Sequence, residues 1–432
     1  MELLYLSAVM LFVLFLLLGS GVWVGLSLMG VAWVVFLLFT EAPAGDAMIT
    51  VVWSGSISWT LIALPLFIWM GEILYRTRLS EDLFRGLAPW MTSLPGGLLH
   101  MNIVGSTLFA AISGSSAATL TIVGKMSIPE LRKRGYPEKM IVGTLAGSAT
   151  LGLMIPPSLT LIVYGVTVNE SITRLFMAGV IPGLVLAGLF MGYVAIWSVL
   201  SRSKFEQQAN AMSFRQKLRN SRFLIPLLCL IFVIIGSMYS GFATATEAAA
   251  LGVVGALSLA AVQGSLSVAT VSASLLGAVR TSAMIALILM GASFLSLSMG
   301  YTGLPIELAE WISSLSLTPF TLLAMLTVFY IVIGMFLDGI SSVVLTMAVV
   351  EPMIRASGID VIWFGIFIVV VVEMAQITPP IGFNLFILQG ITRHPIGYLA
   401  RAALPMFMIM LLMIMILIAF PQLALWMPGS MM

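Results

Sequence analysis

Long apolar segments joined by short polar stretches make up nearly the whole chain, beginning with MELLYLSAVMLFVLFLLLG and VWVGLSLMGVAWVVFLLF in the first 40 residues. A helix that crosses a bilayer needs about 20 mostly apolar residues, so the chain can supply on the order of ten such helices and several shorter ones. Only 8% of its 432 residues are charged, against roughly 25% in an average soluble domain. The sequence therefore predicts an all-α polytopic membrane protein whose first apolar segment is a retained span rather than a signal peptide.

The few charged and reactive residues exclude several classes of function. A balance of 19 Lys and Arg against 17 Asp and Glu gives a net charge of +2, too small to indicate a nucleic-acid partner. Cys229, the single cysteine, lies in an apolar run where core packing is its expected role, and it cannot form an internal disulfide. With only His100 and His394 beside it, and with no HExxH or GxSxG motif, neither a zinc site nor an enzyme is expected.

Basic residues gather in three polar stretches, at residues 75–85, 125–139 and 201–222. Excess Lys and Arg in short loops marks the cytoplasmic side of a membrane, so we place these stretches inside and both termini outside. The chain must then leave and return to the inner side between residues 98 and 130, in pieces too short for two full spans. This length predicts a re-entrant helical hairpin.

Three motifs of the first half recur in the same order in the second half. FIWMGEILYRTRLSEDLFRGLAPW corresponds loosely to LILMGASFLSLSMGYTGLPIELAEW, SGSS to DGISS, and MIPPSLTLIVYG to QITPPIGFNLFI. The second set begins from the opposite side of the membrane, because its first segment starts beside the cytoplasmic Arg280 and runs outward. The halves are therefore predicted to be inverted-topology repeats, each with a re-entrant hairpin and a helix broken at a Pro-Pro pair, as in secondary transporters with a midplane site.

The expected organisation follows from this path. We expect N-terminal scaffold spans at 1–57, a first repeat at 58–200 with its hairpin at 98–130, a cytoplasmic amphipathic connector at 201–222, central scaffold spans at 223–279, a second repeat at 280–400 with its hairpin at 318–356, and a C-terminal span at 401–432.

The two hairpin tips, SGSS at 113–116 and DGISS at 338–342, combine glycine with hydroxyl groups. Irregular backbone at membrane depth is tolerated only where it faces protein or water, and glycine permits the turn. Half-helix N-termini at such tips attract anions, while free carbonyls and serine hydroxyls offer oxygen ligands to a small cation. Close helix packing through small residues is the alternative explanation. Duplication in both halves favours the binding sites.

Both Pro-Pro pairs are expected to break their helices within the membrane. Proline lacks an N–H donor, so each pair frees backbone carbonyls in the preceding turn. Polar residues cluster around the pairs: Ser158 and Thr160 in the first copy, and Glu373, Gln376, Thr378 and Asn384 in the second.

Five motifs, taken in order, resemble the large membrane subunit of tripartite ATP-independent periplasmic (TRAP) transporters: SGSSAATLTIVGKMSIPELRKRGYP, GLMIPPSLTLIVYGV, ATATEAAALGVVGAL, FLDGISSVVLT and EMAQITPPIGFNLFIL. The resemblance covers about residues 5–425. It implies a sodium-driven importer of the bacterial inner membrane that works by an elevator movement, with no cofactor besides the coupling ion. It also implies two partners: a periplasmic substrate-binding protein and a small four-helix membrane subunit on a separate chain. The implied substrates are organic anions such as C4-dicarboxylates, sialic acids and 2-oxo acids.

The resemblance also implies which residues bind. The implied sodium ligands lie at the two tips and the second break: Ser113, Gly114, Ser115, Ser116, Asp338, Gly339, Ser341, Ser342 and Thr378. The implied substrate site lies at the two breaks: Pro156, Pro157, Ser158, Pro379, Pro380, Gly382 and Asn384. Thr119 stands where many relatives carry Asn or an acidic residue. Glu247 in TATE is either a cap of the helix that follows it or a substrate contact.

Two other functions stay open at this stage. One is a stand-alone sodium:carboxylate symporter or ion antiporter of related architecture, which would need neither partner protein. The other is a non-transporting membrane scaffold or an intramembrane enzyme. Measurements of flux and of sodium dependence in liposomes separate the three.

Overall fold

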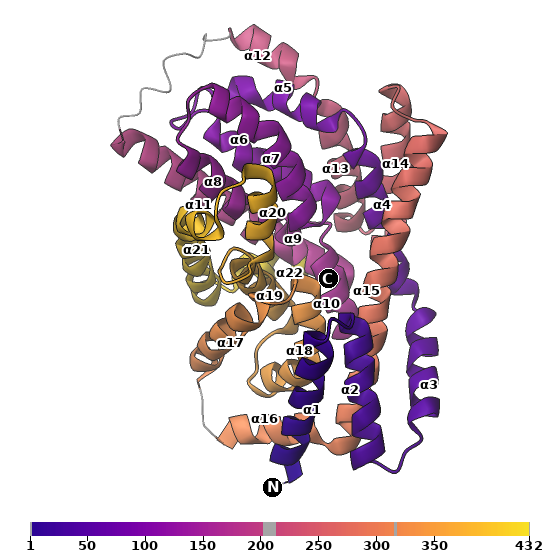
Figure 1. The fold of residues 1–432 in the computed structure, drawn as a ribbon. Coiled ribbons are helices and arrows are strands. Elements are labelled where there is room, and N and C mark those ends of the chain that lie inside the picture. The colour runs from indigo at the N-terminus through magenta and orange to yellow at the C-terminus, as the bar shows by residue number, and fades with distance from the viewer. Residues whose placement is uncertain (1, 202–212, 315–317, 432) are drawn as a thin grey trace.

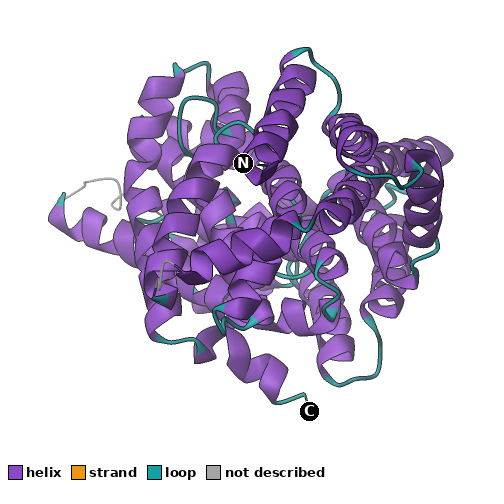
Figure 2. Cartoon of the chain, turned by 90° about the horizontal axis from the view of Figure 1, so that it is seen from below, coloured by secondary structure: helices purple, strands orange, loops and turns teal. Residues whose placement is uncertain are grey.

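A computed structural model describes residues 2–201, 213–314 and 318–431, and every regular element in these ranges is a helix (Figure 1). Figure 2, turned by 90° from that view, shows the helices joined by loops. Residues 202–212, which belong to the expected connector, lie outside the described residues.

The elements up to the connector are α1 (Glu2–Gly19), α2 (Val24–Phe39), α3 (Ala44–Ser56), the 3₁₀ turn η1 (Trp59–Ile62), α4 (Ala63–Tyr75), α5 (Leu79–Met91), α6 (Leu99–Ser113), α7 (Ser116–Lys133), α8 (Glu138–Ala149), α9 (Leu151–Met154), α10 (Leu159–Thr167), α11 (Ile172–Leu200) and α12 (Phe214–Ser221). The later ones are α13 (Ile225–Tyr239), α14 (Ala245–Val262), α15 (Val268–Thr302), α16 (Leu304–Ser314), α17 (Pro319–Gly334), α18 (Gly339–Ala356), α19 (Val361–Gln376), α20 (Phe383–Thr392), α21 (Ile396–Ala419) and α22 (Gln422–Gly429).

Several helices have the length and composition of membrane spans. Within the described ranges five qualify alone, namely α11, α14, α15, α18 and α21, and the number reaches eight if each bent helix pair counts as one span. The bent pairs are α3 with η1 and α4, α8 and α9 with α10, and α12 with α13, with bends of 58°, 42° and 56°. The predicted all-α multi-span architecture is confirmed.

Two sequence expectations are wrong. The span expected to begin beside Arg280 begins at Val268, where the Ser267 hydroxyl accepts the N–H of Thr270 and caps α15. Cys229 was expected in the core but is exposed on α13. An apolar side chain of a membrane protein needs no protein core, because lipid is itself an apolar environment.

The helices form two groups in Figure 1. On the right, α2 and α3 pack against α15, while α4 packs against α14 and α15. In the centre and on the left, α19 packs against α11, α17, α18 and α21, and every one of its residues is buried. Helix pair α6–α7 lies in the upper half of the view and α17–α18 in the lower half. The hairpin tips and helix breaks belong to this second group.

Candidate ion and substrate site at two helix breaks

The first tip (residues 113–116) turns the chain from α6 into α7. Gly114 has a φ of 59°, in the left-handed region that disfavours a side chain. A Cβ at this position would lie 2.7 Å from the carbonyl oxygen of Pro157. The backbone N–H of Leu159 donates to the carbonyl of Gly114 over 3.3 Å. The first tip therefore sits directly on the first break, the non-helical residues 155–158 between α9 and α10.

Hydroxyl groups hold the first tip together. The hydroxyls of Ser113 and Thr119 lie 2.9 Å apart, and Thr119 donates to the carbonyl of Ser115 over 2.8 Å. The Ser115 hydroxyl caps α7 by accepting the N–H of Ala118. Thr119 thus orders the predicted sodium ligands Ser113 and Ser115 through these hydrogen bonds.

The first break is closed by its own residues. Pro156 and Pro157 are buried and joined by a cis peptide bond. The Ser158 hydroxyl donates to the carbonyl of Leu153, one of the groups that the proline pair was expected to free, and accepts the N–H of Leu161 over 3.2 Å. Ser158 therefore supplies hydrogen bonds to backbone groups on both sides of the break. It is also the N-cap of α10, whose N-terminus points at the first tip.

The second tip (residues 338–342) carries a carboxylate that acts as a helix cap. Asp338 accepts the N–H groups of Ile340 and Ser341 over 3.1 and 3.3 Å, and the Ser341 hydroxyl donates to it as well. The Ser342 hydroxyl is buried and makes no hydrogen bond within the described residues. Asp338 is therefore the N-cap of α18. The Ser342 hydroxyl oxygen is left free to bind a ligand at this tip.

The second tip docks on the second break (residues 377–382) much as the first tip docks on the first. The N–H of Gly382, whose φ is 55°, donates over 3.3 Å to the carbonyl of Met335 just before the tip. The Thr378 hydroxyl donates over 2.6 Å to the carbonyl of Met374 in the last turn of α19. Pro379 and Pro380, again joined by a cis bond, are exposed.

One side-chain contact links the first tip to the second break. The Ser116 hydroxyl donates to Oδ1 of Asn384 over 3.4 Å, and both residues are buried. Within the described ranges, no hydrogen bond joins the two tips directly. The predicted ligands thus form two clusters, and Asn384 on α20 bridges from the second break to the first tip.

A buried carboxylate in the same region was named at the sequence level only as a polar neighbour. Glu373 on α19 is 1% exposed, and neither carboxylate oxygen has a hydrogen-bond partner within the described part of the chain. An acidic residue in EMAQITPP was the available signal, because ionisable groups inside membranes mark functional sites by default.

Glu247 has the capping role. It accepts the backbone N–H of Thr244 over 2.8 Å, and the Thr244 hydroxyl accepts the N–H of Glu247, which completes a capping box at the start of α14. Its side chain is exposed and belongs to neither tip.

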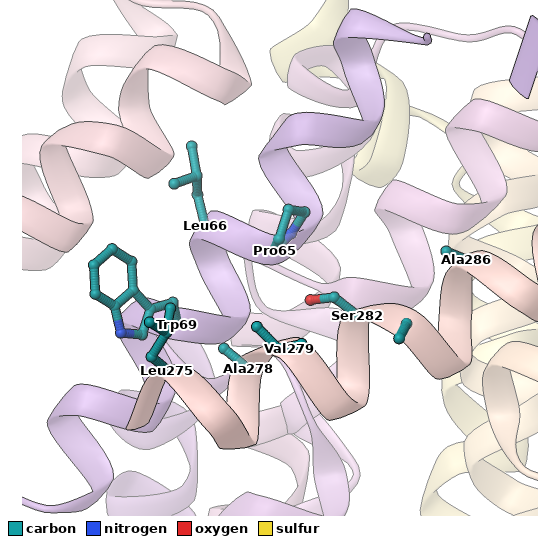
Figure 3. Close-up of a pocket in the computed structure, with 9 residues that line it drawn as sticks. Pro65, Leu66, Trp69, Leu275, Ala278, Val279, Ser282 and Ala286 are labelled. Carbon is teal, nitrogen blue, oxygen red and sulfur yellow. The ribbon is translucent and has the colours of Figure 1, made fainter. Parts of the chain in front are cut away.

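An apolar cavity of about 370 Å³ lies apart from these clusters, between α4 and α15 (Figure 3). Its lining includes Pro65 and Trp69 on α4 and Leu275 and Val279 on α15. None of the predicted ion or substrate ligands lines it. In the described ranges no cluster of three or more His, Cys, Asp and Glu residues is arranged to hold a metal ion.

A helical multi-span chain with two tips docked on two Pro-Pro breaks defines a membrane transport protein. The structure of the Alcanivorax borkumensis YdaH transporter is similar in fold, with a TM-score of 0.64, 15% identity and coverage of 94% of this chain and 97% of that one. The family model described as "Tripartite ATP-independent periplasmic transporter, DctM component" matches residues 9–423, and the chain belongs to this family. The resemblance drawn from the five motifs is confirmed, and the chain is a membrane permease rather than an enzyme.

Relatives in this family carry different substrate names. The C4-dicarboxylate TRAP transporter large permease protein DctM of Pseudomonas aeruginosa is 31% identical over 86% of each chain. The sialic acid permease SiaM of Vibrio cholerae is 29% identical over 95% of this chain and 96% of its own. The ectoine/5-hydroxyectoine permease UehC of Ruegeria pomeroyi is 29% identical over 90% and 91%. Similar identities to all three leave the substrate open.

Proposed function

We propose that this chain is the sodium-coupled permease subunit of a tripartite importer in the bacterial inner membrane. It moves an organic anion that a periplasmic binding protein delivers, and a small four-helix membrane subunit on a separate chain completes the permease. The relatives named for C4-dicarboxylates and sialic acid support an anionic substrate. The observation that carries the proposal is the docking of each tip on a Pro-Pro break, through Gly114 with Leu159 and Met335 with Gly382.

This docking supplies the groups that an anion and a cation need. Helices α7, α10, α18 and α20 all begin at a tip or a break, so several partial positive charges gather there. Hydroxyl and carbonyl oxygens offer ligands to sodium. In this proposal sodium binds at each tip, and the anion binds where the breaks meet, near Ser158 and Asn384. Asp338 holds the shape of the second tip through its cap.

The proposed movement is an elevator of one body past a frame. We assign α2, α3, α4, α13, α14 and α15 to the frame, because they pack mainly on one another. The two hairpins and broken helices form the moving body. Helices α11 and α21 join this body, because they pack against α8 and α19. The halves are inverted repeats in this scheme, consistent with the opposite heights of α6–α7 and α17–α18 in Figure 1.

The test reconstitutes the chain in liposomes with an inward sodium gradient and follows labelled dicarboxylate and sialic acid. The chain is assayed alone, then with the small subunit, then with the loaded binding protein. We expect substantial uptake only with all three proteins, and loss of uptake when choline replaces sodium. Uptake by the chain alone at the full rate would instead favour the stand-alone symporter. Uptake that ignores sodium would contradict the coupling.

A further inference from the structure

Glu373 is a buried charge without a compensating partner. No Lys, Arg or His pairs with it within the described ranges, where the ion pairs are Glu72 with Arg76, Glu130 with Arg134, Glu138 with Arg132 and His394, and Glu351 with Arg355. An ionised carboxylate buried alone is strongly unfavourable, and leaving both of its oxygens without donors adds to the cost. Either a proton on the carboxyl group or a cation bound beside it must therefore offset this cost.

Other polar side chains lie close to this carboxylate. The Ser116 hydroxyl at the start of α7 lies next to it, and Ser116 contacts Oδ1 of Asn384. Gln376 lies three residues further along α19, on the same helix face as Glu373, and its Oε1 is buried with no partner within the described residues. Three elements, α7, α19 and α20, thus bring carboxylate, hydroxyl and amide oxygens to one buried place.

The N-terminus of α7 cannot supply the missing charge. A helix dipole returns much less free energy than the burial of an unpaired carboxylate costs. Conversely, a cation bound beside Ser116 would be repelled by that same N-terminus unless a negative group lay close by. A bound cation would therefore offset the cost of burying the Glu373 carboxylate, and the carboxylate would offset the repulsion between the cation and the N-terminus of α7. Oxygen donors of this kind are the ligands that sodium takes in such sites.

We propose that Glu373 is a direct sodium ligand, and that Ser116, Gln376 and Asn384 complete its site between the first tip and the second break. The inference rests on the proposed sodium coupling and deepens it by naming the charged ligand. It places one sodium ion across the two halves of the chain, because Ser116 belongs to the first hairpin and the other three residues to α19 and α20. Sodium would then tie α7 to α20.

The test measures sodium binding without transport. The purified full chain in detergent is titrated with NaCl against choline chloride at constant ionic strength, and thermal unfolding and ²²Na⁺ binding are followed. In the wild type, sodium should raise the unfolding temperature. Glu373→Gln should raise the sodium concentration for half-maximal stabilisation at least tenfold. Without sodium it should unfold at the same or a higher temperature than the wild type, because the unpaired charge is gone.

Two further variants keep the test decisive. Glu351→Gln removes a carboxylate of α18 that pairs with Arg355 over 2.9 Å, and its sodium dependence should match the wild type. Asn384→Ala removes a second proposed ligand and should weaken sodium binding even if Glu373→Gln does not fold. A wild type that ignores sodium would refute the proposed coupling itself. A sodium response in the wild type that Glu373→Gln and Asn384→Ala both retain would overturn only the assignment of this site.

Discussion

The two tips share a glycine-hydroxyl pattern, but they handle negative charge in opposite ways. At the second tip the carboxylate of Asp338 lies within the turn and is satisfied by backbone N–H groups of α18. At the first tip the side chains of the turn carry only hydroxyls. The nearby carboxylate of Glu373 comes from α19, lies next to the Ser116 hydroxyl, and has no hydrogen bond of good geometry within the described residues. A carboxylate inside a tip is thus a structural cap, whereas a carboxylate across from a tip is available to a cation.

The breaks differ as well. Pro156 and Pro157 of the first break are buried, whereas Pro379 and Pro380 of the second are exposed on the surface of the chain. The first break is sealed by the tip that sits on it and by Ser158. The second break therefore forms the exposed side of the site. Because the first tip packs on a buried break, we expect substitutions at the first tip to destabilise the protein more than substitutions at the second.

The largest expected effect is that of Gly114→Ala compared with Gly339→Ala. At Gly114 the left-handed backbone and the contact with the Pro157 carbonyl together should cost about 2–5 kcal/mol. At Gly339 a Cβ would meet only side-chain atoms, 3.1 Å away, so the cost should stay below about 1.5 kcal/mol. Thermal unfolding in detergent, with uptake in liposomes, measures both. Equal losses in the two variants would show that the tips are equally constrained.

The next effect concerns the cap at the second tip. Asp338→Ala should destabilise the protein by about 1 kcal/mol, because two N–H groups of α18 lose their acceptor. Asp338→Asn should retain most of the stability, since asparagine caps about as well as aspartate. Thermal unfolding at fixed sodium concentration compares the pair. If Asp338→Asn instead unfolds as early as the alanine variant, the negative charge itself is needed at this tip.

A smaller effect on stability is expected when the Ser342 hydroxyl at the second tip is removed. The Ser342 hydroxyl is buried without a partner within the described part of the chain, so Ser342→Ala should change stability by less than about 0.5 kcal/mol. If Ser342 binds sodium as proposed, the sodium concentration for half-maximal uptake should rise several-fold. Thr327→Ala, which removes a buried hydroxyl that only bonds Leu323 within its own helix, is the control. An equal change in both variants would remove Ser342 from the sodium site.

The sequence predicted those parts of the molecule that depend on local pattern. Helices α11 and α14 follow the pattern that predicted membrane spans, because each is an apolar run between polar neighbours. The start of α15 was missed because VATVSASLLGAV mixes small and apolar residues that suit a loop or a helix, and only the cap by Ser267 decides. The Asp338 cap was not predicted, since Asp338 was named only as an implied sodium ligand.

The sequence could not reveal properties that arise from packing. Glu373 and Asp338 look alike in the sequence, as single acidic residues in apolar surroundings. Only the fold shows that one meets backbone donors and the other does not. The bridge from Ser116 to Asn384 joins segments far apart in the chain, and no local pattern encodes it. The burial of one Pro-Pro pair and the exposure of the other have the same origin.

The last and smallest perturbation tests whether the two tips enter the membrane from opposite sides. With Cys229 first replaced by Ser, single cysteines at Lys133 and Ala356 mark the ends of α7 and α18 away from the tips, where both side chains are exposed. Surface substitutions of this kind change stability by about 0.5 kcal/mol or less, so both variants should fold and transport normally. An impermeant maleimide should label the cysteine at 356 in intact spheroplasts, and the one at 133 only after the membrane is opened, because the basic stretch around 133 marks the inner side. Labelling of both from one side would contradict the inverted arrangement, and with it the idea that the two tips meet a common midplane site from opposite faces.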